Sequence, residues 1–278
     1  MGVVSINRKG ATAQRKTHYS LFIYAERSRS IHYSLKKVSN FKFKQFEIQQ
    51  DKCAMKIGTD AVLLGAWANI VQAFYILDIG TGTGILALMA AQRNPNAVIH
   101  AVEIEAAAQL QAAQNIRNSP WAQRIQVFPQ SIQDFTQTFP DKQYDSILSN
   151  PPYFDHKASS YISDEARQTA RNTSELSFET LLHCIQKLLH PQGNCSVILP
   201  VQEGNNFIKQ ALAIGFYLKT LTKVQPRADK EPNRLLIELV KYPCEVVENE
   251  LTIRNAGKGQ QDYTEGYKEL HGGFYLAM

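Results

Sequence analysis

A run of four residues, Asn150-Pro151-Pro152-Tyr153, combines the groups needed to hold a planar amino group on an aromatic ring. The Asn150 carboxamide oxygen and the Pro151 carbonyl oxygen can each accept one N–H of such an amine. The two prolines fix φ and remove two backbone donors, so the turn is stiff and presents acceptors. Tyr153 can stack on the same ring. Taken alone, the run is equally compatible with an ordinary turn at the end of a strand.

A second run, Asp78-Ile79-Gly80-Thr81-Gly82-Thr83-Gly84, places three alternate glycines behind an acidic residue. Glycine tolerates unusual φ values and has no Cβ, so such a turn lets a ligand approach the backbone. The spacing differs from the G-x-G-x-x-G pattern of nicotinamide-binding proteins. A further acid stands 19 residues after the last glycine, where a carboxylate can accept both hydroxyls of a ribose. The candidate residues of this nucleotide site are Asp78, Gly80, Gly82, Gly84 and Glu103.

Both runs stand at the ends of expected strands, within a repeated alternation of short apolar runs and helical segments. This alternation is typical of an α/β fold with a mostly parallel sheet and helices on both faces. The expected strands are residues 74–79, 97–103, 125–128, 144–149, 194–199, 216–222 and 235–241. The expected helices are residues 85–92, 105–117, 178–189 and 201–214. Because the carboxyl ends of such strands bind ligands, we expect the two runs to share one rim of the sheet.

Two segments outside this alternation complete the expected domain. Before the first strand, residues 41–46 open a short structured stretch, and Thr59-Asp60 is expected to cap a helix over residues 61–68. After the fourth strand, residues 153–177 form a long irregular connection, which we expect to be a substrate loop.

Together, the two runs resemble the Rossmann-like S-adenosylmethionine-dependent methyltransferases that carry Asn-Pro-Pro-Tyr, and within them the bacterial subfamily that methylates N6 of adenine 37 in tRNA1(Val). The similarity covers roughly residues 41–278. It implies a class I fold, with a seven-stranded, mostly parallel sheet and an antiparallel last strand. It also implies S-adenosyl-L-methionine as cofactor and tRNA as partner. Outside the two runs it is carried by Phe43-Lys44-Gln45-Phe46, Cys53-Ala54-Met55-Lys56-Ile57-Gly58-Thr59-Asp60, Leu63-Leu64-Gly65-Ala66-Trp67, Leu86-Ala87-Leu88-Met89, Asn118-Ser119-Pro120-Trp121-Ala122 and Phe274-Tyr275-Leu276.

The resemblance also assigns roles to individual residues. It makes Asn150-Pro151-Pro152-Tyr153 the catalytic turn, which holds the target amine. It places Asp78 near the methionine amine of the cofactor and Glu103 at its ribose. It places Thr59 and Asp60 beside the sulfonium side of the cofactor pocket.

The contact with the adenine of the cofactor is the point at which this sequence departs from the family pattern. An Asp usually follows the third strand, whereas this chain has Ser131 at the matching place and Asp134 three residues later. Ser131 is the candidate cofactor residue, and Asp134 is either a substitute for it or a solvated acid in a turn. The sequence leaves this choice open.

Other functions stay compatible with the two runs. The same acceptors serve enzymes that methylate a guanine amine of rRNA, a glutamine of release factors or adenine in DNA. A nucleotide-responsive RNA-binding protein without catalysis would share the glycine turn. Basic residues near the expected rim either contact RNA phosphates or are solvated surface. They are Lys157, Arg167, Arg171, Lys223, Arg227, Lys230 and Arg234.

Composition excludes several classes of protein. The chain has 278 residues, of which 44% are hydrophobic, the range of a globular protein with a packed core. The uncharged stretch over residues 61–77 is too short and too polar to span a membrane. Four widely spaced cysteines, without a C-x-x-C pair, suggest neither a metal site nor disulfides, so a reducing cytoplasm is expected. No obligate protein partner can be read from the sequence.

Charge is unevenly distributed along the chain. Residues 1–39 hold eight Lys and Arg against one acid, or +7, which leaves the remaining residues at −2 of the total +5. This leader has few periodic apolar positions. We therefore expect residues 1–40 to be a basic, flexible N-terminal extension, and residues 41–278 to be the methyltransferase domain.

Overall fold

The computed structural model describes residues 19–24, 32–37, 40–51, 53, 57–152, 176–257 and 262–276. Contacts divide the chain into two compact units, residues 1–39 and 40–278. In the first unit, strands β1 (Tyr19–Tyr24) and β2 (His32–Lys37) pair antiparallel. The flexibility expected of the leader stays a prediction.

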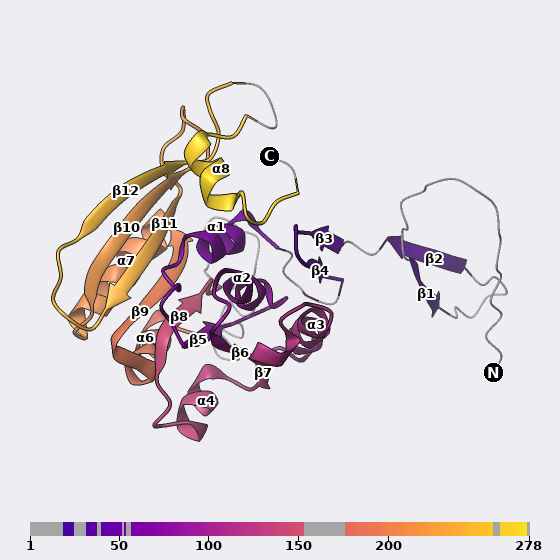
Figure 1. Ribbon diagram of the computed structural model, residues 1–278, viewed down its shortest axis with the longest axis horizontal. Coiled ribbons are helices and arrows are strands. Elements are labelled where there is room, and N and C mark those ends of the chain that lie inside the picture. Colours follow the sequence, from indigo (N-terminus) through magenta and orange to yellow (C-terminus); the bar gives the residue numbers. More distant parts are fainter. Residues whose placement is uncertain are drawn as a thin grey trace, which may run out of the picture. The chain divides into compact units, whose positions relative to one another are not determined.

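The second unit is built on a sheet that has eight strands within the described residues (Figure 1). Its strand order is β12-β10-β11-β9-β8-β5-β6-β7. Strands β7, β6, β5, β8 and β9 run parallel, whereas β11 is antiparallel to both of its neighbours. These strands are β5 (Tyr75–Ile79), β6 (Val98–Glu103), β7 (Ile125–Pro129), β8 (Tyr144–Ser149), β9 (Leu189–Pro200), β10 (Tyr217–Gln225), β11 (Arg234–Val240) and β12 (Val247–Thr252). The mostly parallel sheet confirms the predicted α/β class, and β11 is the antiparallel last strand of the predicted set.

Strand β12 is the eighth strand, which the sequence prediction of seven strands misses. It lies at the edge of the sheet and pairs parallel with β10. Its first four residues are exposed, and its sequence Val-Glu-Asn-Glu-Leu-Thr contains no apolar run. An edge strand with a solvated face needs no such run, so apolar patterning cannot find it.

Helices cover both faces of the sheet (Figure 1). Alternate residues of one strand enter different cores: Ile76 packs with α1 and α2, whereas Leu77 packs with α4, α6 and α7. The helices are α1 (Thr59–Trp67), α2 (Ile85–Arg93), α3 (Ala106–Arg117), α4 (Ile132–Thr138), α6 (Phe178–Leu188), α7 (Val201–Ala213) and α8 (Glu265–His271). The short helices α4 and α8 are absent from the sequence prediction. In the part of the chain that the structure describes, no helix is long and apolar enough to cross a bilayer.

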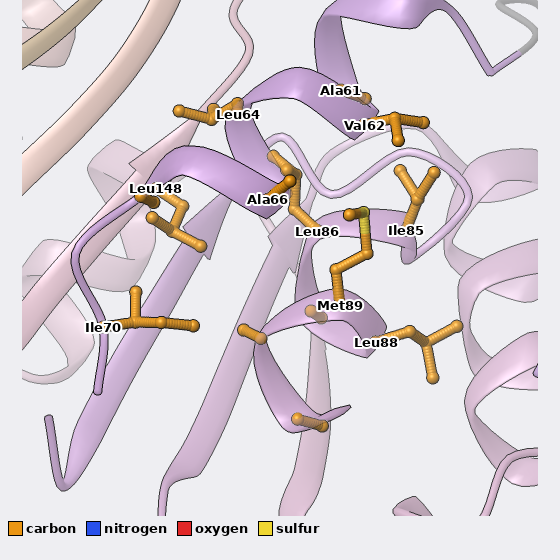
Figure 2. Packing of buried hydrophobic residues seen from close by; sticks show 14 of the residues in the cluster. Ala61, Val62, Leu64, Ala66, Ile70, Ile85, Leu86, Leu88, Met89 and Leu148 are labelled. Atoms are coloured by element: carbon orange, nitrogen blue, oxygen red, sulfur yellow. The ribbon is translucent and has the colours of Figure 1, made fainter. Parts of the chain in front are cut away.

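Helices α1 and α2 pack unusually closely because α1 contains a glycine at the contact. A Cβ on Gly65 would lie 2.6 Å from the Met89 sulfur. Figure 2 shows the Met89 side chain directed from α2 toward α1. Arg93, at the end of α2, donates through Nη1 to the carbonyl oxygens of Gly65 and Ala68, at 2.9 and 2.7 Å. The last carbonyls of α1 are therefore satisfied by α2.

The start of α1 differs from the sequence prediction. Gly58 is the N-cap residue and no side chain caps the helix, so the prediction that Thr59-Asp60 supplies the cap is wrong. Asp60 lies in the first turn, where a negative charge interacts favourably with the helix dipole. Its Oδ2 accepts a hydrogen bond from Arg234 Nε of β11 at 2.8 Å. A hairpin of β3 (Asn40–Lys42) and β4 (Glu47–Gln49) precedes this helix.

Candidate active site

The three glycines of the turn between β5 and α2 have two different roles. Gly80, Gly82 and Gly84 have φ values of 72°, 56° and 85°, a region that side chains disfavour. A Cβ built on either of the first two meets no atom within 4 Å. A Cβ on Gly84 would lie 3.5 Å from Ala112 of α3. The first two glycines therefore border open space, whereas the third packs against a helix.

Asp78 is fully buried beneath this turn. Its Oδ2 accepts hydrogen bonds from Thr81 Oγ1 at 2.5 Å and from the Ala87 backbone N–H at 3.1 Å. Its Oδ1 has no partner among the described residues. Burial raises the pKa of Asp78 to about 7; the two hydrogen bonds oppose this rise, and the negative charge of Glu103 adds to it. The carboxyl group thus joins the turn to α2 and keeps one acceptor oxygen unused.

Glu103, the last residue of β6, contacts the glycine turn directly. Its Oε2 accepts from the Gly82 N–H at 2.8 Å, and its Oε1 accepts from the Glu105 N–H at 2.9 Å. The carbonyl of Val102 also accepts from the Gly80 N–H at 2.9 Å. Each carboxylate oxygen has a further lone pair, so Glu103 can accept additional hydrogen bonds beside the open space.

The strand register brings Asn150 to the same rim. Ile79 of β5 pairs with Val102 on one side and with Ser149 on the other. The next residue of each strand is Gly80, Glu103 or Asn150, and neighbouring strands lie about 4.8 Å apart. Ser149 Oγ also donates to the Ile79 carbonyl oxygen at 3.0 Å, which ties the two strand ends together. The glycine turn and the Asn-Pro-Pro turn therefore leave the sheet side by side.

Comparisons with known proteins agree with this arrangement. The family model of the methyltransferase small domain matches residues 55–176. The chain is 45% identical over 240 residues to the tRNA1(Val) (adenine(37)-N6)-methyltransferase of Tolumonas auensis, which covers 86% of this chain and 98% of that protein. The chain belongs to the tRNA1(Val) (adenine(37)-N6)-methyltransferase family. A member from Vibrio cholerae is 43% identical over 86% of this chain and 96% of its own.

A solved structure supports the fold alone. A predicted O-methyltransferase from Agrobacterium tumefaciens aligns with a TM-score of 0.60 and 19% identity, covering 77% of this chain and 96% of that chain. With this likeness and the observed strand order, the chain has the Rossmann-like methyltransferase fold that the sequence predicts.

The remaining candidate residues lie on other elements, at the start of α1 and at the start of α4. Thr59 is exposed at the start of α1, and Asp60 is engaged by Arg234. Ser131 Oγ accepts from the Asp134 N–H at 3.0 Å and donates to Asp134 Oδ2 at 2.6 Å. These two residues therefore cap α4 together, so the alternatives for the adenine contact form one bonded pair. Ser131 and Asp134 follow β7, at the far end of the rim.

The candidate catalytic turn, residues 150–153, is only partly described. Pro151 is buried and Pro152 is exposed, whereas Tyr153 lies outside the described residues. Lys157, Arg167 and Arg171 also lie outside them.

Three of the other basic candidates form ion pairs. Lys223 Nζ lies 3.1 Å from Glu248 Oε2, Arg227 pairs with Asp229, and Arg234 pairs with Asp60. These partners partly neutralise the charge that the sequence offers to RNA phosphates. Among the described residues, no group of three His, Cys, Asp or Glu side chains is placed to hold a metal ion.

Sequence reasoning misses Ile104 as a rim residue. It directly follows Glu103 and is 59% exposed, although it is a large apolar side chain. In the sequence, an apolar residue after a strand-ending acid is indistinguishable from a continuation of the strand. Only its exposure, directly after the end of β6, identifies it as a candidate ligand contact.

Proposed function

We propose that this protein transfers a methyl group from S-adenosyl-L-methionine to the N6 amine of an adenine in tRNA, with adenine 37 of tRNA1(Val) as its substrate. The observation that carries this proposal is the strand register that sets Asn150 beside the glycine turn. Relatives 41–45% identical to this chain carry that activity in their names. The cytoplasmic location expected from the sequence stays a prediction.

The residues at the rim fit a nucleoside with a cationic amino acid portion. Because Gly80 and Gly82 have no Cβ, the space beside them stays open and a ligand can approach the backbone. Glu103 has acceptor capacity for ribose hydroxyls, and the exposed Ile104 can pack against a base. The unpartnered Oδ1 of Asp78 suits an ammonium group, directly or through water. These contacts would hold the cofactor with its reactive carbon toward Asn150.

Asn150 and Pro151 supply the second half of the site. The Asn150 carboxamide oxygen accepts one N–H of the target amine and the Pro151 carbonyl oxygen accepts the other. Two acceptors favour the geometry in which the nitrogen lone pair is less conjugated with the ring and points toward the methyl donor. S-adenosyl-L-methionine, when bound, would supply an electrophilic methyl group: the amine nitrogen bonds to the methyl carbon as the carbon–sulfur bond breaks, which neutralises the sulfonium, and the amine releases one N–H proton to solvent. The protein therefore accelerates the reaction mainly by proximity and alignment, which can supply about 7–11 kcal/mol.

Three further features belong to this proposal: a base-stacking residue, further residues of the cofactor pocket, and the basic extension. Tyr153 would stack on the target base, at a gain of roughly 1–3 kcal/mol. Thr59, beside the sulfonium, and Ser131, with Asp134 at the adenine, would complete the cofactor pocket. The basic extension over residues 1–40 would attract tRNA phosphates without contributing to the methyltransferase domain, residues 41–278.

The direct test uses tRNA from a strain that lacks this protein. The tRNA is incubated with the purified protein and isotopically labelled S-adenosyl-L-methionine, digested, and mapped by mass spectrometry. We expect label in N6-methyladenosine at position 37 of tRNA1(Val), and none in a transcript with guanosine at that position. Parallel incubations with rRNA, release factor and DNA serve as controls. Label in one of these controls, with none in tRNA, would overturn the proposal.

A further inference from the structure

The side chain of Asn115, on α3, links two segments that are far apart in the sequence. It is 1% exposed. Its Oδ1 accepts from the Gln49 N–H at 2.9 Å, and its Nδ2 donates to the Gln49 carbonyl oxygen at 2.9 Å. The same Nδ2 donates to the carbonyl oxygen of Thr83 at 2.8 Å. One carboxamide therefore binds both backbone groups of the last residue of β4 and one carbonyl of the glycine turn.

The segment that begins at Gln49 leads from β4 to α1. The side chain of the next residue, Gln50, accepts from the Ile57 N–H at 2.8 Å and closes the segment into a loop before α1. Burial, together with the negative charges of Glu105, Glu103 and Asp51, raises the pKa of the Cys53 thiol in this segment to about 11. The geometric link to the glycine turn is the Asn115 amide, whose Nδ2 donates to the carbonyl oxygens of both Gln49 and Thr83.

The other end of the link, the Thr83 carbonyl, lies in the glycine turn of the candidate cofactor site. Thr83 lies between Gly82, whose N–H reaches Glu103, and Gly84, which packs on Ala112 of α3. A hydrogen bond to the Thr83 carbonyl fixes the peptide plane between Thr83 and Gly84. Asn115 therefore sets the orientation of the turn at Thr83.

We propose that Asn115 is a positioning residue for the cofactor, resting on the methyltransferase function proposed above. It holds the end of β4 at Gln49 and the glycine turn at Thr83 at a fixed separation, so that the turn is oriented before the cofactor binds. Asparagine suits this task because it presents an acceptor and two donor hydrogens in one plane. Aspartate lacks the donors, and alanine removes the partner of one buried backbone group, the Thr83 carbonyl, and of two part-buried groups of Gln49.

Asn94 offers a matched control for this proposal. It is also an asparagine, is 2% exposed and makes several backbone hydrogen bonds, including Nδ2 to the carbonyl oxygens of Ile70 and Ala73, each at 2.7 Å. Those partners precede β5, at the amino end of the sheet, away from the glycine turn. Its replacement removes a buried asparagine of similar connectivity that binds neither Gln49 nor the glycine turn.

The test compares Asn115→Ala and Asn115→Asp with Asn94→Ala at a temperature at which circular dichroism shows each protein folded. The dissociation constant for S-adenosylhomocysteine is measured by calorimetry, and amide hydrogen exchange at residue 49 is measured without ligand. We expect both Asn115 variants to weaken binding by about tenfold. KM for S-adenosyl-L-methionine should rise while KM for tRNA stays unchanged. Exchange at residue 49 should be faster in Asn115→Ala, and Asn94→Ala should bind like the parent.

Two results would overturn the inference. One is a folded Asn115 variant that binds S-adenosylhomocysteine as tightly as the parent. The other is an equal loss of affinity in Asn94→Ala, which would reduce Asn115 to a general stabilising role. If Asn115→Ala does not fold, Asn115→Asp, which keeps the shape and the acceptor, decides the question. Binding of S-adenosylhomocysteine by a parent protein that methylates no tRNA would instead refute the proposed function and leave the Asn115 comparison interpretable.

Discussion

Replacement of Asp78 by asparagine should change the pH dependence of stability in a defined direction. The pKa of this buried carboxyl group rises from its ordinary 3.8 to about 7, first because burial penalises the charged form. At about 1.36 kcal/mol per pKa unit, this rise corresponds to a cost of about 4 kcal/mol for ionised Asp78 in the folded protein. Asp78 binds its proton more tightly in the folded state than in the unfolded state. The loss of folding stability therefore develops between about pH 4 and pH 7 and stays constant above pH 7.

Asp78→Asn removes this titration but retains an oxygen that can accept from Thr81 and Ala87. The assay is urea unfolding of both proteins without cofactor, at pH 5 and at pH 8. Other titrating groups are common to both proteins, so they cancel in the difference between the two free energies of unfolding. We expect the free energy of unfolding of the variant, relative to that of the parent, to increase by about 3 kcal/mol from pH 5 to pH 8. In the same variant, cofactor affinity should fall, because the ionised oxygen that would meet the ammonium group is gone. A difference that is equal at the two pH values would refute this reasoning about Asp78.

Substitutions at Gly82 and Gly193 test the turn and the sheet, and a substitution at Gly215 is the control. Gly82→Ala should weaken cofactor binding measured by calorimetry, because its methyl group enters the open space. Gly215→Ala, with φ of 92° and equally open surroundings, should lower stability by a similar amount and leave cofactor binding unchanged. Equal cofactor affinities in the two variants would contradict the assignment of that space. Gly193→Ala should lower the free energy of unfolding measured in urea by about 1–3 kcal/mol, because its Cβ would lie 2.8 Å from the Asp145 carbonyl oxygen. An unchanged midpoint of unfolding would show that β8 and β9 can separate without cost.

The sequence predicts those parts of the fold that are buried on both faces. Strands such as β5 and β9 read as apolar runs because helices cover both of their sides. Strand β12 escapes prediction because it lies at the edge and exposes polar residues. The predicted cap at Thr59-Asp60 fails for a related reason: Asp60 binds Arg234, a partner 174 residues away that no local pattern reveals.

The candidate site also has parts that the sequence predicts and parts that it does not. The glycine turn and the Asn150 turn are local patterns, so their positions at strand ends follow from the sequence. The sequence also predicts that they share one rim of the sheet, whereas the pairing of Ile79 with Ser149, which sets them on adjacent strands, comes only from the structure. Asn115 carries no signal of its own, because its partners Gln49 and Thr83 lie 66 and 32 residues away. Links of this kind depend on tertiary packing and must be observed.

Single-turnover methyl transfer by Asn150→Ala tests most directly whether the two turns act as one site. The parent and the variant are each saturated with S-adenosyl-L-methionine and tRNA1(Val), and the rate of N6-methyladenosine formation is compared. Loss of one acceptor that aligns the amine should slow transfer about 100-fold or more, while the dissociation constant for S-adenosylhomocysteine stays within about twofold of the parent value. Transfer at the parent rate would contradict the central claim that Asn150 holds the amine beside the glycine turn.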